Sequence, residues 1–162
     1  MPSVSSKKEN MIEGVVIKEL VTNTDSRGFF REIVRKSDDF FSEGFGQWSH
    51  ALMFEGVIKA WHLHNIQVDW WYVGTGVVRV GLCDMRPKSP TYKKTMDFLM
   101  GDHQPSRVVK IPPGVAHGMK TVQGPVNFFY ITSQTYNPKD ELRIPYNDPG
   151  IDFDWLAGPP IK

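Results

Sequence analysis

The sequence predicts an all-β protein, either a sandwich or a barrel. Short apolar segments, several rich in β-branched residues, recur at near-regular spacing, with turn signals between them. The 14 Gly and 12 Pro residues lie mainly between these segments, where they punctuate the chain. No stretch of 12 residues shows the clean 3.6-residue period of an amphipathic helix. Together, these three observations favour one domain built from short strands.

The first strand is expected within residues 13–22, where apolar and polar residues alternate. Residues 25–28, Asp-Ser-Arg-Gly, form a turn, after which the chain is extended over 29–36. One short helical turn is expected within 37–46. Further strands are expected at residues 50–54, 56–64, 69–74, 76–85, 107–111 and 126–136. We expect residues 1–10 to form a flexible tail, residues 11–162 to form a single domain, and the last dozen residues to be irregular.

Composition excludes several classes of protein. The formal net charge is +1, so we expect no binding to nucleic acid or to an anionic membrane. The longest apolar stretches, such as residues 128–131, are far too short to span a bilayer, and residues 1–10 lack the apolar region of a secretory signal. The single cysteine, Cys83, cannot form an intramolecular disulfide and is expected to be buried. These features predict a protein of the reducing cytoplasm.

Two histidines one residue apart are the main candidates for chemistry. On a strand, His62 and His64 project to the same face, and inside a barrel that face lines a pocket. Asp69 follows after a break in the strand pattern, and His117 follows a Pro-Pro-Gly turn. These residue types suit a metal site or a proton-transfer site, and buried structural histidines are the third alternative.

The spacing of these residues resembles the two motifs of the cupin superfamily. The first motif is matched by Gly56, His62, His64, Asp69 and Gly76, with Asp69 where cupins usually have Glu. The second is matched by Pro112, Gly114 and His117, although its first Gly and last Asn are replaced by Ser106 and Thr121. The resemblance implies a double-stranded β-helix, or jelly-roll barrel. In metal-bearing cupins these positions hold Fe, Mn, Ni or Zn.

A second resemblance covers residues 15–155. The chain resembles the dTDP-4-dehydrorhamnose 3,5-epimerase family, a metal-free branch of the cupins. The most specific match is the signature Asp-x-Arg-Gly-x-Phe-x-Glu at residues 25–32. Further matches are Gln47, Gly56 to His62, Asp84-x-Arg86-x-x-Ser89-Pro90-Thr91, Pro113 to Gly118, Tyr136-Asn137-Pro138 and Asp148-Pro149.

This resemblance implies a reaction on a 4-keto-6-deoxy nucleotide sugar. The keto group acidifies the C–H bonds at C3 and C5, so a base can remove a proton to give an enolate, and an acid can return one to the opposite face. The resemblance implies that His62 is the base and Tyr136 the acid, with no cofactor required. It also implies that the substrate is bound by Arg27, Phe30, Glu32, Gln47, Lys59, His64 and His117. The family forms homodimers by exchange of N-terminal strands, which would carry Arg27 and Glu32 to a partner's pocket.

Three departures from the family pattern leave alternatives open. Asp69 stands where the family has a lysine that stabilises the enolate oxygen, and His64 stands where it has Gln. The family's C-terminal aspartate, which orients the base, has no counterpart before Lys162. Asp69 could replace that aspartate as the partner of His62. Alternatively, His62, His64, Asp69 and His117 could hold a divalent transition metal, as in a metal-dependent isomerase or oxygenase. A sugar-nucleotide binder without turnover is the third alternative.

Overall fold

The computed structural model describes residues 11–157, which form ten strands and two short 3₁₀ helices. The predicted flexible tail, residues 1–10, lies outside the described residues. The strands are β1 (Val16–Glu19), β2 (Asn23–Asp25), β3 (Gly28–Phe30), β4 (Gln47–Met53), β5 (Ile58–Leu63), β6 (Asp69–Asp84), β7 (Thr95–Gly101), β8 (Arg107–Ile111), β9 (Val115–Thr132) and β10 (Leu142–Arg143). The 3₁₀ helices are η2 (Asp39–Phe41) and η3 (Pro138–Asp140).

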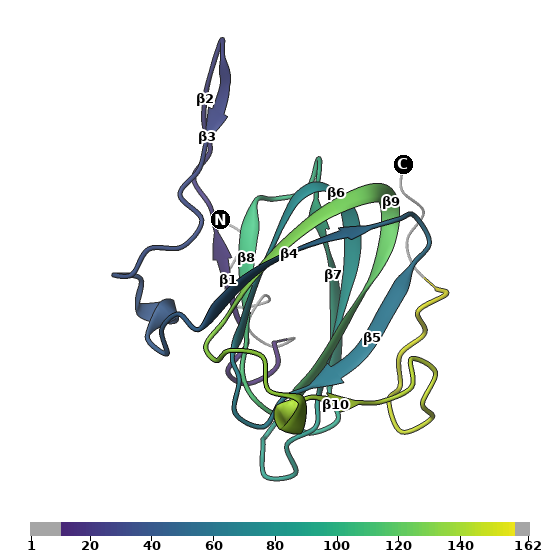
Figure 1. Cartoon of the computed structure of the whole chain (residues 1–162). Helices are drawn as coiled ribbons and strands as arrows, with labels where there is room; N and C mark the ends of the chain where they lie inside the picture. Colours follow the sequence, from purple (N-terminus) through teal and green to yellow (C-terminus); the bar gives the residue numbers. More distant parts are fainter. Residues whose placement is uncertain (1–10, 158–162) are drawn as a thin grey trace, which may run out of the picture.

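Eight of the strands form one antiparallel sheet that curves into a barrel (Figure 1). Its two long strands, β6 and β9, pair with each other and bend across the molecule. β6 also pairs with β7 and β8, while β9 also pairs with β4 and β5. This topology confirms the predicted all-β cupin-type barrel. Among residues 11–157, no helix is long and apolar enough to cross a membrane.

The predicted strand boundaries are wrong at several places. β4 begins at Gln47 and not at residue 50. Residues 69–74 and 76–85 were expected as two strands, but they form the single strand β6. The register of its pairing with β9 shifts repeatedly between Val73 and Val78, because Gly-Thr-Gly produces irregularities here and not a turn. β9 begins at Val115, far before the expected residue 126, and ends at Thr132 rather than at residue 136. β7 was not predicted, since its alternation of polar and apolar residues is interrupted by the three consecutive apolar residues 98–100.

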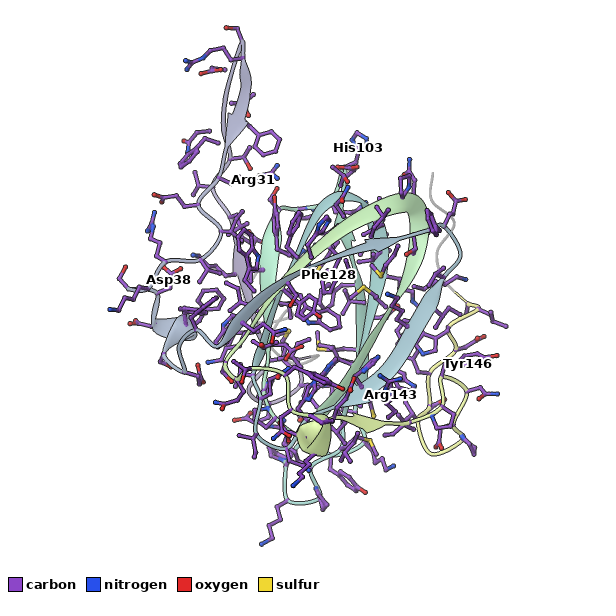
Figure 2. The ribbon with its side chains drawn as sticks, viewed as in Figure 1. Arg31, Asp38, His103, Phe128, Arg143 and Tyr146 are labelled. Atoms are coloured by element: carbon purple, nitrogen blue, oxygen red, sulfur yellow. The ribbon has the colours of Figure 1, made fainter. Side chains whose placement is uncertain are left out.

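The barrel buries apolar residues on both faces of its sheet. The interior cluster includes Trp71, Val80, Met119 and Phe128, and Figure 2 shows Phe128 inside the barrel. Outside it, Trp61 packs against Phe153 and Trp155 of the C-terminal segment, and Trp70 packs against Phe41 of η2. β6 is therefore buried over almost its whole length, because both of its faces are covered. Cys83 lies in the C-terminal cluster and is buried, as predicted.

The hairpin of β2 and β3 stands apart from the barrel. These strands pair only with each other, and Figure 1 shows them projecting away from the sheet. Their side chains are exposed, including Phe29 and Phe30, which are 59% and 62% accessible. An isolated two-stranded hairpin buries little apolar surface and is marginal in water.

Candidate active site

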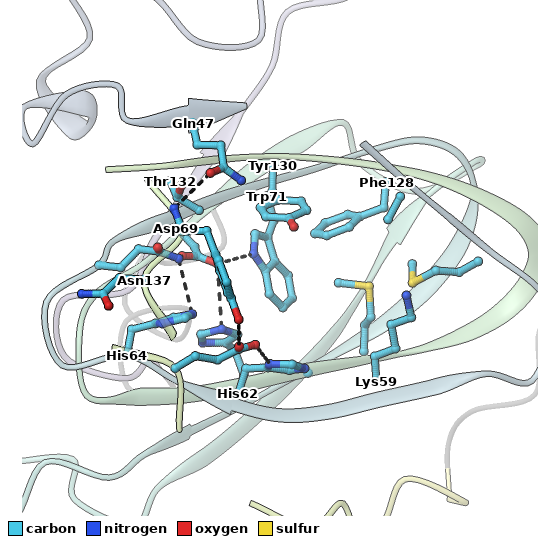
Figure 3. A pocket seen from close by; sticks show the side chains of 18 residues that line it. Gln47, Lys59, His62, His64, Asp69, Trp71, Phe128, Tyr130, Thr132 and Asn137 are labelled. Carbon is cyan, nitrogen blue, oxygen red and sulfur yellow. Dashed lines mark hydrogen bonds and ion pairs between the residues drawn. The ribbon is translucent and has the colours of Figure 1, made fainter. Parts of the chain in front are cut away.

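One end of the barrel interior holds a cavity of about 270 Å³ that gathers most of the predicted site residues (Figure 3). His62 comes from β5, Asp69 from the start of β6 and His117 from β9. The segment that follows β9 closes one side of the cavity with Tyr136 and Glu141. The remaining predicted residues that line it are Gln47, Lys59 and His64.

Strand pairing places the histidines together. In the antiparallel pairing of β5 with β9, His62 lies opposite His117, and the two rings are 6.3 Å apart and nearly parallel. His64, two residues further along the chain, lies 5.4 Å from the same His117 ring. Close approach of the two strands requires glycine at position 118, since a Cβ there would lie 2.4 Å from the Cβ of Ala60.

His62 is directed at a carboxylate. Its Nδ1 lies 3.3 Å from Oε1 of Glu141, and its side chain is 34% accessible. Burial lowers the pKa of His62, and the Glu141 carboxylate offsets part of that shift. The imidazole is therefore neutral at pH 7. Because Nδ1 donates to Glu141, Nε2 keeps its lone pair and can accept a proton.

The other two histidines are fixed by backbone carbonyl groups. Nδ1 of His64 donates to the carbonyl oxygen of Asp140 at 2.8 Å, and Nδ1 of His117 donates to that of Val115 at 3.0 Å. A carbonyl oxygen can only accept, so each Nδ1 carries a hydrogen and each Nε2 is an acceptor. Nε2 of His64 lies 3.4 Å from the side-chain amide nitrogen of Gln67, which can donate to it. Burial lowers the pKa of His117 to about 4, although Asp69 opposes the shift.

Asp69 is buried and does not contact His62. Its Oδ1 accepts a hydrogen bond from the side-chain amide of Gln67 at 2.7 Å, and its Oδ2 accepts one from the indole of Trp71 at 3.1 Å. Oδ2 also lies 3.9 Å from Nε2 of His117, which is too long for a hydrogen bond. The carboxylate beside His62 is thus Glu141 and not Asp69. The expectation that Asp69 could replace the family's aspartate as the partner of His62 is therefore wrong.

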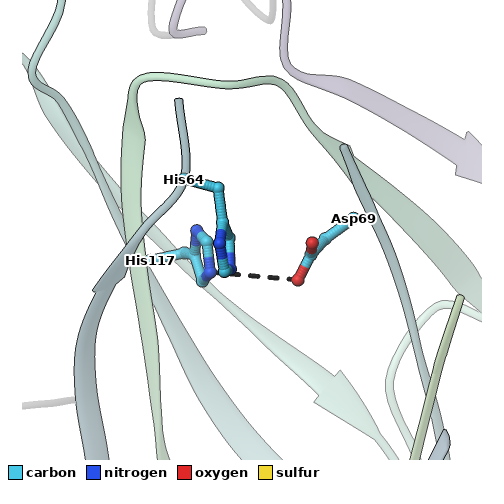
Figure 4. Close-up of side chains that lie close together, drawn as sticks. All are labelled: His64, Asp69 and His117. Carbon is cyan, nitrogen blue, oxygen red and sulfur yellow. Dashed lines mark ion pairs between the residues drawn. The ribbon is translucent and has the colours of Figure 1, made fainter. Parts of the chain in front are cut away.

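Three of the four residues predicted as metal ligands converge (Figure 4). One ligand atom from each of His64, Asp69 and His117 lies within 4.8 Å of the other two. Two imidazoles and a carboxylate form a donor set that suits Fe(II) and other divalent transition metals. Within residues 11–157, His62 does not belong to this group. A cation held by the three would therefore leave His62 free to act as a base.

Tyr136 reaches the cavity through the segment between β9 and η3. Its hydroxyl donates to Oε2 of Glu141 at 3.2 Å, and its backbone N–H donates to Oε1 of Gln47 at 3.0 Å. Glu141 was not singled out in the sequence, because an acidic residue just after a Pro-containing turn looks like a solvated loop residue. The pairing of β10 with β5, which sets Arg143 opposite His62, is what brings it inward.

The neighbouring Asp140 anchors this segment. Its buried carboxylate accepts hydrogen bonds from the backbone N–H groups of Asn65, Ile66 and Gln67, with shortest distances of 2.8, 3.1 and 3.0 Å. These three residues link β5 to β6, so Asp140 joins the turn that follows His64 to the segment that carries Tyr136 and Glu141.

The other predicted substrate-binding residues lie elsewhere. Arg27, Phe30 and Glu32 belong to the β2–β3 hairpin or follow it, and none of them lines this chain's own cavity. Arg27 is exposed and pairs with Asp25 at 2.5 Å, while Glu32 pairs with Arg35. Lys59, by contrast, is an exposed residue that lines the cavity.

The motif at residues 84–91 lies outside the cavity and has a structural role. Asp84, in the stretch Asp-x-Arg-x-x-Ser-Pro-Thr, is fully buried and accepts hydrogen bonds from the side chains of Arg86, Ser89 and Thr91. Although burial raises the pKa of Asp84, these donors hold it well below its usual range. The motif therefore fixes the turn between β6 and β7.

Comparison with known proteins decides the family. The family model described as dTDP-4-dehydrorhamnose 3,5-epimerase matches residues 9–162. The chain belongs to the dTDP-4-dehydrorhamnose 3,5-epimerase family. It is 43% identical over 148 residues to the spore coat polysaccharide biosynthesis protein SpsL of Bacillus subtilis, covering 90% of this chain and 97% of that protein. It is also 33% identical to the Haloferax volcanii protein named "probable low-salt glycan biosynthesis epimerase Agl13", with coverage of 90% and 96%.

A solved structure of this family shares the fold. The dTDP-6-deoxy-D-glucose-3,5-epimerase RmlC of Legionella pneumophila, in complex with dTDP-4-keto-L-rhamnose, superposes with a TM-score of 0.79 at 28% identity. That match covers 89% of this chain and 79% of the Legionella chain. The family resemblance and the fold predicted from the sequence are both confirmed, and with them the assignment to a family of sugar-nucleotide epimerases.

Proposed function

We propose that this protein epimerises a 4-keto-6-deoxy nucleotide sugar at C3, at C5 or at both, through an enolate, in polysaccharide or deoxysugar biosynthesis. The observation that carries the proposal is the arrangement of His62 and Tyr136 in one barrel cavity, with a neutral imidazole whose Nε2 is free. Membership of the epimerase family and the sugar-nucleotide ligand of the Legionella relative support it.

In this reaction Nε2 of His62 removes the proton α to the keto group. The C–H bond electrons move into the enolate, and the phenol of Tyr136 returns a proton from the other side of the sugar ring. A neutral imidazole suits the first step, because a protonated one has no lone pair to accept with. Lys59, His64 and His117 would contact the substrate, with the ammonium of Lys59 directed at phosphate.

A panel of 4-keto sugars carried on dTDP, GDP and CDP, incubated in D₂O, tests this proposal. Deuterium should enter C3 or C5 with the native protein. The rate of deuterium uptake should fall by about 10²- to 10⁴-fold in His62→Asn and Tyr136→Phe, because each variant loses a proton-transfer group. His50→Asn and Tyr146→Phe, at positions outside the cavity, serve as matched controls. Tight binding of a sugar nucleotide without any deuterium uptake would instead support a binding protein without turnover.

The homodimer belongs to the same proposal. Arg27, Phe30 and Glu32 would complete a partner's pocket, because the β2–β3 hairpin projects from the barrel and exposes two phenylalanines. Mixing Arg27→Ala with His62→Asn protein tests this. In a mixed dimer one pocket would combine a native Arg27 with a native His62, so activity should return. Activity that stays absent on mixing, or a monomeric mass in solution, would contradict exchange.

The convergence of His64, Asp69 and His117 supports a second candidate, a metal-dependent isomerase or oxygenase. These three residues would hold a divalent cation, which would supply Lewis-acid polarisation of a substrate oxygen. Elemental analysis and titration with Co(II), followed by its absorption spectrum, test the site without an activity assay. Stoichiometric binding lost in His64→Ala but kept in His62→Asn would favour this candidate. Absence of binding in the native protein would remove it.

A further inference from the structure

One carboxylate lies between the two groups to which we assign proton transfer. Oε1 of Glu141 lies 3.3 Å from Nδ1 of His62, and Oε2 accepts a hydrogen bond from the hydroxyl of Tyr136 at 3.2 Å. Base and acid therefore bind opposite oxygen atoms of the same side chain. In Figure 3 the dashed line at the His62 ring marks the first of these contacts.

The position of Glu141 is set by the fold and not by a flexible loop. The preceding residue, Asp140, is tied to three backbone N–H groups of the turn after His64. The following residues, Leu142 and Arg143, pair with β5 at Leu63 and His62. Anchored on both sides, the Glu141 side chain is only 16% accessible, so it is held against His62.

The charge of Glu141 suits a supporting role. Although burial raises its pKa, hydrogen bonds from Tyr136 and the positive charge of Arg143 hold it below the usual range for a glutamate. Glu141 is therefore ionised at neutral pH. An ionised carboxylate accepts the Nδ1–H of a neutral imidazole and stabilises the imidazolium that forms when Nε2 takes a proton.

We propose that Glu141 is the positioning residue of this site, orienting His62 as a base and holding the Tyr136 phenol in place through a single carboxylate. The inference rests on the proposed epimerase function. It also identifies which residue fills the role of the carboxylate that the sequence comparison with the family left without a counterpart.

The proton steps balance around this carboxylate. A substrate C–H bond breaks, its proton forms an N–H bond at Nε2 of His62, and its electron pair enters the enolate. The imidazolium is then paired with Glu141. The Tyr136 O–H turns from Glu141 to the carbon, where the O–H bond breaks and a new C–H bond forms. Exchange with water removes the proton from His62 and restores the phenol before the next turnover.

The discriminating variant is Glu141→Gln, which keeps the size of the side chain and removes its charge. Because the Glu141 charge raises the pKa of His62, the variant should move the acidic limb of the kcat/KM profile to lower pH. The rate of deuterium uptake at C3 or C5 should fall by about 100-fold through kcat, with KM little changed, since misplacing a reacting group by about 1 Å costs that much. Glu13→Gln, remote from the cavity, is the control.

A purely structural role for Glu141 would lower the amount of folded protein without moving the acidic limb. Glu141→Asp provides a second measurement should Glu141→Gln not fold. This variant keeps the charge, so the acidic limb of its kcat/KM profile should stay near the native pH while its rate of deuterium uptake falls. The inference would be overturned if Glu141→Gln changed neither the rate of deuterium uptake nor the pH of the acidic limb. It would also be overturned if the acidic limb moved equally far in Glu141→Asp. Failure of the native protein to incorporate deuterium from any 4-keto sugar would contradict the proposed function instead.

Discussion

Oε1 of Gln47 accepts the backbone N–H of Tyr136 at 3.0 Å, so strand β4 holds the segment that carries the phenol. The family resemblance implied that Gln47 binds the substrate. In the structure its carbonyl oxygen is engaged within the protein, and its amide nitrogen donates to Ser49 at 3.0 Å. Gln47 thus lines the cavity with a side chain whose two polar atoms already have partners.

This contact predicts the kinetic signature of Gln47→Ala. Loss of the acceptor should loosen the Tyr136 segment and lower kcat by about 10-fold with little change in KM, since a small displacement of a proton donor is costly. Steady-state kinetics on the best sugar of the panel measures both constants. The exposed Leu52→Ala on the same strand is the control. A raised KM with an unchanged kcat would show instead that Gln47 binds substrate.

Sequence patterns predicted the barrel and the three histidines because both depend on local signals. Alternation and turn residues mark strands, and two residues of separation on a strand place His62 and His64 on one face. Cupin spacing then added Asp69 and His117. Each of these residues lies on or next to a strand whose pairing is set by the hydrophobic pattern.

Glu141 could not be found in this way. Its place beside His62 depends on a two-residue strand, β10, and on the contacts of Asp140 with a turn some 75 residues earlier. Neither feature has a periodic pattern in the sequence. The same holds for the partners of Asp69, since only the folded chain shows that its oxygen atoms face Gln67 and Trp71. Long-range pairing of short segments is therefore what sequence reasoning missed.

Asp140→Asn should destabilise the protein and weaken catalysis together. The asparagine keeps one acceptor oxygen but replaces the other with a donor that faces backbone N–H groups. Each buried N–H left without a partner costs about 1–3 kcal/mol, so we expect the free energy of unfolding to fall by that amount. Urea denaturation measures the loss. Asp148→Asn, whose carboxylate accepts from the nearby Gly150 N–H at 2.8 Å, is a matched control.

Asp84 should make the fold sensitive to acid. Its pKa in the folded protein is below the unfolded value of about 3.9, so its stabilisation is complete above that value and is lost as the pH falls toward the folded pKa. Asp84→Asn should lower the free energy of unfolding by about 1–3 kcal/mol at pH 7, because the partly buried Arg86 guanidinium and the two hydroxyl groups lose their ionised acceptor. The difference from the native protein should shrink below pH 4. Urea denaturation at pH 7 and pH 3.5 measures it, with Asp97→Asn as control.

A difference that is constant between these pH values would mean that the pKa of Asp84 is the same in the folded and unfolded states. Asp97 is a suitable control because it also pairs with an arginine, at 2.7 Å, but its own side chain is 42% accessible. Exposed ion pairs contribute only about 0–1 kcal/mol, so this variant should remain close to native at both pH values.

His117 should make the free energy of unfolding depend on pH in a second range, which lies at higher pH than the range set by Asp84. Burial lowers its pKa to about 4 in the folded protein, whereas an unfolded histidine titrates near 6.5. The unfolded state therefore binds more protons between these values, and stability falls as the pH drops from about 6.5 toward 4. His117→Gln removes this titration, so its unfolding free energy should vary less over that range. Urea denaturation in steps from pH 7 to 4 measures the slope, with the exposed His103→Gln as control. A slope in His117→Gln as steep as in the native protein would show that another group is responsible.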